Sequence, residues 1–215
     1  MANANKLNGF TPVGYLNGAD WDGRGRIYAI PAANTNPLFV GDPVTLIAGA
    51  DSSYYLPCID RAAVGTTPLV GVVLAIGTNP RGLGPWVNPA NLNNILYRPS
   101  GSQAANTPSQ YYALVADDPN TIFEAQEQAS GGAGTNFTQT AANKNAQFSV
   151  ALDPPGLPPY YSQAFIDNGT AAAVTATFAL KLLGLKQSID NAPGPWQRWL
   201  CLINQHYYRT GVVGI

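Results

Sequence analysis

The amino-acid sequence predicts an all-β protein, a single jelly-roll-like sandwich or barrel body that follows an extended N-terminal arm. From Arg26 onward, glycine and proline recur at about the spacing of short strands, as they do in β-sandwiches and barrels. The runs between them are either alternating or wholly apolar, and no segment has the period of a long amphipathic helix. All-β proteins of about this length often form one domain, so we expect a single body.

The first 25 residues have a different pattern. They are rich in Asn and Gly and carry isolated apolar residues without a sustained period. We therefore predict an arm at 1–25 and a body at 26–215. Exposed apolar side chains in such an arm need a surface to lie against, which makes them candidates for contact with a partner or a sister subunit. These candidates are Leu7, Phe10, Val13, Tyr15, Leu16 and Trp21.

Several runs in the body predict individual strands. Runs that are apolar on both faces are typical of central or covered strands, and they occur at 43–48, 69–76, 111–116 and 199–203. Runs that alternate apolar and polar residues predict half-buried strands, and they occur at 121–127, 147–153 and 174–182. The sequence Asp-Asp-Pro-Asn at 117–120 is typical of a turn, so we predict that 111–116 and 121–127 form a hairpin.

Charge is scarce, since only 11% of residues are Asp, Glu, Lys or Arg against about 25% in average soluble domains. A surface built from uncharged polar groups is easier to desolvate, which favours contact with other protein. The chain has no extended Lys/Arg cluster, so we expect no nucleic-acid partner. It has no apolar run of membrane length and begins without the pattern of a signal peptide. We therefore expect synthesis in a cytoplasm, with Cys58 and Cys201 as free buried thiols.

No catalytic or cofactor-binding pattern emerges from the sequence. The histidine His206 lies at a predicted strand end, which favours a structural role, and no G-x-S-x-G motif is present. Glu124 and Glu127 are three residues apart and fall on opposite faces of a strand. A calcium loop starting at Asp20 would need a glutamate at its twelfth position, where Pro31 stands; a looser calcium site there stays open. We predict a protein that is not an enzyme and holds no cofactor.

Tyrosines often occur in adjacent pairs, at 54–55, 111–112, 160–161 and 207–208. Adjacent residues of a strand point to opposite faces, so each pair predicts one ring in the core and one outside. An outward ring can stack on a sugar or fill a protein interface. A glycan-binding β-sandwich therefore stays open as an alternative function.

Three parts of the chain resemble the head decoration, or capsid cement, proteins of tailed bacteriophages. The opening residues 1–13 are similar to the start of those proteins, and residues 112–127 are similar to their most recognisable segment. The late segments 182–185, 190–192 and 199–204 fit the order found there, whereas 79–107 and 131–146 show no such likeness.

The resemblance implies a structural virion protein, made in the host cytoplasm and located on the capsid exterior. Such proteins are β-rich, often jelly-roll or barrel-like, and they cement neighbouring subunits of the major capsid protein against the pressure of packaged DNA. The implied partners are the major capsid protein and the chain itself, with a homotrimer favoured and a homodimer also compatible.

Overall fold

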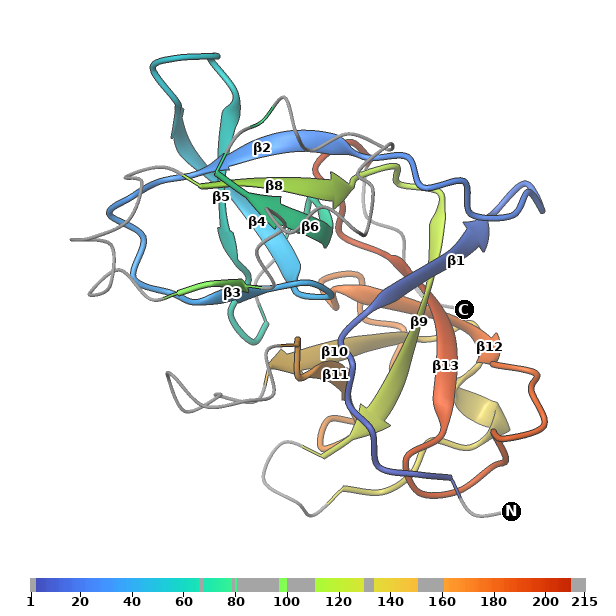
Figure 1. Cartoon of the computed structure of the whole chain (residues 1–215). Helices are drawn as coiled ribbons and strands as arrows, with labels where there is room; N and C mark the ends of the chain where they lie inside the picture. Colours follow the sequence, from blue (N-terminus) through green and yellow to red (C-terminus); the bar gives the residue numbers. More distant parts are fainter. Residues whose placement is uncertain are drawn as a thin grey trace.

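A computed structural model describes residues 3–65, 68–78, 80, 97–99, 111–129, 134–150 and 161–209 of the chain. The regular elements in these ranges are strands, apart from a 3₁₀ turn at Gln139–Ala141. The predicted all-β fold with a barrel-like body is thus confirmed. The strands form two closed units, called here the upper and the lower body from their positions in Figure 1, and one core cluster joins them, with Val72 and Ala116 from the upper and Phe148 from the lower body.

The upper body is a closed five-stranded barrel with the strand order β2-β5-β4-β6-β8. Its pairs are antiparallel except for β2 and β5, which run parallel. The five strands are β2 (Arg26–Ile30), β4 (Pro43–Ala50), β5 (Pro57–Arg61), β6 (Gly71–Gly77) and β8 (Tyr111–Ala116). Beside it, β3 (Leu38–Phe39) pairs with β7 (Tyr97–Arg98).

The lower body is a six-stranded sheet with the order β1-β9-β11-β10-β12-β13. Because β13 also pairs with β9, five of these strands close a second ring, and β1 is added to β9 from outside. Its core contains Phe123, Phe148 and Trp199. The six strands are β1 (Thr11–Tyr15), β9 (Thr121–Gln128), β10 (Asn145–Val150), β11 (Ala164–Asp167), β12 (Leu180–Leu185) and β13 (Arg198–Ile203).

The hairpin predicted at 111–127 is wrong, because β8 and β9 belong to different bodies. β8 pairs with β2 and β6, whereas β9 pairs with β1, β11 and β13. The predicted turn does form, and the Thr121 amide donates to the Asp118 carbonyl at 3.0 Å. Each of the two strands pairs with neighbouring strands on both of its edges, and these neighbours belong to its own body. The turn is therefore the crossing between the two bodies.

The strand predicted at 174–182 is only partly correct. β12 begins at Leu180, and the residues before it form turns in which the Phe178 amide donates to the Thr175 carbonyl at 3.2 Å. Val174 is 54% exposed and has no core to face. Apolar and polar residues alternate at 174–179, but a strand also needs a neighbouring strand to pair with. The described structure provides no such neighbour for these residues. The run at 147–153 begins as β10, and its last residues, 151–153, lie outside the described ranges.

The N-terminal segment lies along its own chain. β1 pairs antiparallel with β9, and Phe10 is 3% exposed in the core of the lower body. The Phe10 amide donates to the Gly41 carbonyl at 2.9 Å. Gly9 has a φ of +65°, and a Cβ there would lie 2.5 Å from the Gly41 oxygen. Removing residues 1–20 would therefore take away the strand β1 and the core side chain of Phe10. The loss of any partner binding in such a truncated chain would report on its folding and not on a direct contact.

The burial of Phe10 leads to a stability prediction. We expect Phe10→Ala to lower the free energy of unfolding by about 3–5 kcal/mol, because it removes a large buried ring and leaves a cavity. Urea unfolding followed by circular dichroism measures this loss. Leu16, which is 53% exposed, supplies the control, and Leu16→Ala should change stability by at most about 0.5 kcal/mol. Equal losses in the two variants would show that residue 10 does not lie in the core.

Candidate functional site

The structure separates the six predicted interface residues by exposure. Phe10 is buried in the chain's own core, so its assignment to a partner interface is corrected. Leu7 and Val13 are half-buried. Tyr15 and Trp21 are half-buried too and pack on each other, with ring centroids 5.6 Å apart. Leu16 is 53% exposed and is the most available to a partner of the six.

Four aspartates from two separate parts of the sequence line one pocket where the two bodies meet. Asp20, Asp22, Asp117 and Asp118 border a pocket of about 500 Å³ that two arginines also line. The charges are largely paired within the chain.

Arg24 bonds Asp22 at 2.7 Å, and Arg26 lies 3.4 Å from Asp117, which also accepts the Tyr28 hydroxyl at 2.6 Å. Among the residues that the structure describes, no group of three or more His, Cys, Asp or Glu side chains could hold a metal ion. The looser calcium site thus gains no support.

Glu127 forms a buried network that the sequence analysis missed. Its side chain is fully buried and accepts four hydrogen bonds within the lower body. Oε1 accepts the Phe137 amide at 3.2 Å and Asn168 Nδ2 at 3.1 Å, and Oε2 accepts Gln197 Nε2 at 3.0 Å and Trp199 Nε1 at 2.8 Å. Burial raises the pKa of the carboxyl, while the four donors act in the opposite direction.

The inward position of Glu127 could have been predicted from the alternation of residues along β9. Glu127 shares the face of Phe123 and Ala125, which the alternation of β9 places inward. Glu124 points the other way, where it bonds Lys186 at 2.8 Å and Arg198 at 2.9 Å. The two carboxylates therefore do not converge, as the sequence predicts.

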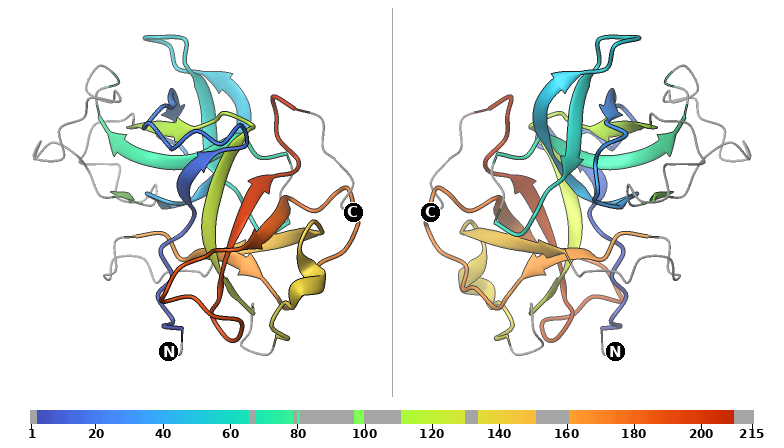
Figure 2. Two further views of the ribbon diagram at one scale, coloured as in Figure 1. Left: turned by 90° about the vertical axis from the view of Figure 1, so that its right-hand side faces the viewer. Right: turned by 90° about the vertical axis from the view of Figure 1, so that its left-hand side faces the viewer.

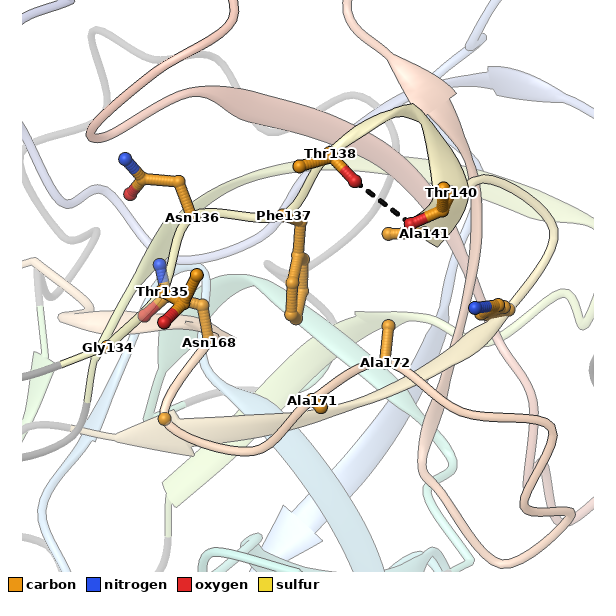
Figure 3. Close-up of a pocket in the computed structure, with 12 residues that line it drawn as sticks. Gly134, Thr135, Asn136, Phe137, Thr138, Thr140, Ala141, Asn168, Ala171 and Ala172 are labelled. Carbon is orange, nitrogen blue, oxygen red and sulfur yellow. Dashed lines mark hydrogen bonds between the residues drawn. The ribbon is translucent and has the colours of Figure 1, made fainter.

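The Glu127 network holds a loop that separates two pockets. Figure 3 shows the Phe137 ring between the 138–141 segment and residues 168–172, in a pocket of about 440 Å³. On its other side, a more apolar pocket of about 490 Å³ is lined by Trp199, Leu185 and Pro193. Phe137 packs edge-on against Trp199, with ring centroids 6.2 Å apart.

His206 has a structural setting. It is 3% exposed, its Nδ1 accepts the Tyr208 amide at 3.0 Å, and its ring lies 5.6 Å from the Tyr208 ring. Burial, together with the charge of Arg209, lowers the pKa of His206 to about 4. Cys58 and Cys201 are free and buried, which confirms the prediction for them.

Of the three adjacent tyrosine pairs that the structure describes in full, none divides into one inward and one outward ring; in the fourth, Tyr161 is exposed and Tyr160 lies outside the described ranges. Tyr111 and Tyr112 are both buried, because both faces of β8 are covered. Tyr54 and Tyr55 are both exposed, since they lie in a turn where strand alternation does not apply. Tyr207 and Tyr208, which follow β13, are also both exposed.

Two exposed aromatic residues have left-handed backbone conformations. Tyr55 has a φ of 56° and is 82% exposed, and Trp196 has a φ of 58° and is 41% exposed. This conformation strains most residues by about 1–3 kcal/mol and persists only where the surroundings impose it. It marks functional sites often enough to make these two residues candidates for contact.

The tip of the β4–β5 hairpin holds Tyr55 rigidly. Asp51 accepts the backbone N–H groups of Ser53, Tyr54 and Leu56 at 2.7–3.1 Å, and the Tyr55 amide donates to the Asp51 carbonyl at 3.1 Å. These bonds lower the pKa of Asp51 against the opposing effect of desolvation. Tyr54 packs edge-on against Tyr112, with ring centroids 6.0 Å apart.

The loop between β12 and β13 holds Trp196 in a comparable way. Asn191 donates to the carbonyls of Lys186 and Arg198 at 2.7 and 2.9 Å and accepts the Arg198 amide at 2.8 Å. The Gly194 amide donates to Gln197 Oε1 at 3.2 Å. The β4–β5 tip and this loop lie at opposite ends of the molecule in all three views (Figures 1 and 2).

Comparison of the chain with protein-family models, curated proteins and solved structures gives no match. In the described part of the chain, no helix has the length and apolar character needed to span a membrane. The candidate sites therefore rest on the chain's own geometry.

The Glu127 network gives a second stability prediction. We expect Glu127→Gln to lower the free energy of unfolding by about 1–3 kcal/mol, because an amide NH₂ would face two donors and leave buried groups unsatisfied. Glu124→Gln is the matched control; it loses two partly exposed ion pairs and should cost at most about 1 kcal/mol. Chemical unfolding at neutral pH compares the two, and an equal effect would contradict the network's role.

The pKa of His206 predicts a pH dependence. The folded state keeps the ring neutral down to about pH 4, whereas the unfolded chain protonates it near 6.5. The unfolded state therefore binds the extra proton between these values, and the free energy of unfolding falls as the pH drops from 6.5 towards 4. Asp117 and Glu127, whose pKa values are raised, act with the opposite sign.

The contribution of His206 is isolated by comparing wild type with His206→Asn. Relative to wild type, the variant should gain up to about 3 kcal/mol between pH 6.5 and 4, since each pKa unit corresponds to about 1.4 kcal/mol. Unfolding curves recorded across this range measure the difference. Parallel pH profiles for the two proteins would refute the assignment.

Proposed function

We propose that this chain is a structural virion protein that binds the outside of an icosahedral phage capsid and cements neighbouring subunits of the major capsid protein. The observation that carries the proposal is the β4–β5 hairpin, which projects from the upper body (Figure 1). Between Pro43 and Pro57 the single charged residue is Asp51, and it is buried. The tip of the hairpin and β4 thus present an uncharged surface, whereas Asp60 and Arg61 lie at the base of the hairpin on β5.

Apolar side chains are exposed along this hairpin and beside it. Ile47 is 36% exposed on β4, and Tyr54 and Tyr55 are exposed at the tip. Tyr207 donates its hydroxyl to the Leu46 carbonyl at 3.3 Å and adds a further exposed ring. Exposed apolar groups of this size, with few charges around them, are typical of surfaces that become covered by protein.

The physical chemistry of the hairpin suits a permanent contact. Burial of its apolar surface would contribute about 25 cal/mol per Å². Because Asp51 holds the tip in one conformation before binding, little entropy is lost on docking. Many symmetric copies on one shell would add their contacts, which suits a protein that resists outward pressure.

The identity of the partner rests on the resemblance to capsid cement proteins, and self-association as a trimer belongs to the same proposal. The N-terminal segment contributes less to the proposed partner contact than the sequence predicts, because most of this segment lies against the body of its own chain. Leu16 remains available for a contact.

The test is cosedimentation of the purified chain with shells of the encoding phage from which the chain has been stripped. Wild-type protein should saturate the shells, and binding should persist in about 1 M NaCl because little of it is electrostatic. Failure of the wild-type chain to bind the shells overturns the proposal.

Tyr55→Asn tests the hairpin. Asn tolerates the left-handed backbone, so the variant should fold as stably as wild type while its affinity for shells falls at least about tenfold, a loss of about 1.4 kcal/mol. Trp196→Asn makes the same kind of change at the opposite end and should bind normally. If Tyr55→Asn binds as tightly as wild type, the hairpin is not the contact.

A further inference from the structure

A small pocket lies where the N-terminal segment meets the loop between β12 and β13. Its volume is about 210 Å³, room for about seven water molecules. The two segments that form it, the N-terminal residues and the β12–β13 loop, lie at the end of the molecule opposite the β4–β5 hairpin (Figures 1 and 2). Its lining consists chiefly of Asn3, Lys6, Gln126, Asp190, Trp196 and Arg198.

The N-terminal segment makes this pocket rigid. Asn3 donates to the carbonyls of Ala192 and Pro195 at 2.7 and 2.9 Å and accepts the Ala192 amide at 2.9 Å. The bond to Pro195 is made directly before Trp196, which helps to impose the left-handed conformation of that residue. The backbone of Trp196 is thus held in place without a ligand.

Few polar groups of the pocket are left for a ligand. The Gln126 amide is engaged, donating to Asn5 Oδ1 at 2.9 Å and accepting the Lys6 amide at 3.0 Å. Arg198 is paired with Glu124 at 2.9 Å and with Asp190 Oδ1 at 2.6 Å. Within the described residues, Asp190 Oδ2, the Lys6 amine and the Trp196 indole N–H have no partner in the chain.

The remaining groups select the chemistry of a ligand. An anion would meet the carboxylate of Asp190, and a cation would meet Lys6 and Arg198. A wholly apolar ligand would desolvate the free amine and carboxylate without replacing their bonds to water. A neutral polyhydroxyl ring avoids each of these costs. Its C–H face can lie on the indole, and its hydroxyls can bond Asp190 and Lys6.

We propose that this pocket binds one neutral sugar residue of a glycan, with Trp196 as the stacking wall and Asp190 and Lys6 as hydrogen-bonding partners. Rigid pockets with an aromatic wall and a few well-placed polar groups are typical of small-ligand sites. The site is independent of the proposed capsid contact, and its place at the other end leaves it open when the hairpin is docked.

The experiment uses the full-length chain without shells. A glycan array of neutral and anionic oligosaccharides identifies the preferred sugar, and its methyl glycoside is then titrated against ¹⁵N-labelled protein. We expect binding in the micromolar to millimolar range and a shift of the Trp196 indole N–H signal, which is assigned by its loss in Trp196→Asn.

Trp196→Asn should fold normally, because Asn tolerates the left-handed conformation, and it should weaken binding at least about tenfold. Asp190→Asn should weaken it as well, through the loss of charge-assisted hydrogen bonds. Tyr55→Asn is the matched control and should bind the sugar as wild type does.

Three results would overturn the proposal. They are the absence of binding by every neutral sugar at about 10 mM, unchanged affinity in Trp196→Asn, and binding of anionic sugars alone. None of them bears on the shell experiment, which depends on the opposite end of the molecule.

Discussion

The buried carboxyl group of Glu127 holds together the parts of the lower body on which the Trp196 pocket depends. Four donors from the 137 loop, from the segment after β11 and from the start of β13 meet on its two oxygens. Taking one donor away would leave a buried acceptor underused, and taking the carboxylate away would strand four donors. The end of the second ring is therefore built around a single side chain.

The effect of Glu127 extends to the surface through Gln197. One end of that amide donates to Glu127, and the other accepts the Gly194 amide in the loop that carries Trp196. Asn3 completes the loop from the opposite side. The backbone position of Trp196 thus follows from a buried carboxyl group and from Asn3, which lies 193 positions away in the sequence.

Tyr55 and Trp196, at opposite ends of the molecule, are held by the same kind of hydrogen bonding. In each loop a buried Asp or Asn takes up several backbone hydrogen bonds, and an aromatic residue is held in a conformation that it would otherwise avoid. Loops of this kind bind with little loss of conformational entropy. Their surroundings differ, because the β4–β5 tip is uncharged and the Trp196 pocket has charged groups on its walls. This difference is why we assign a protein partner to one and a sugar to the other.

Composition and periodicity determined the all-β class, the inward face of β9, the two free thiols and seven of the thirteen described strands, with β12 found only in part. These properties depend on local patterns, since the burial of alternate residues is visible in a single strand. Which strands pair was decided only in the tertiary structure. β8 and β9 are adjacent in sequence and joined by a good turn, yet each is covered by strands from elsewhere, because apolar strands gain more from a complete ring than from each other.

The same reason explains Phe10, which the sequence predicts to contact a partner and which the fold places in its own core. It also explains the strained aromatic residues, since nothing local indicates a left-handed Tyr55 or Trp196. By itself the sequence determined which residues must be buried. The tertiary structure decided which residues pack on each of them, because these packing partners lie far away in the chain.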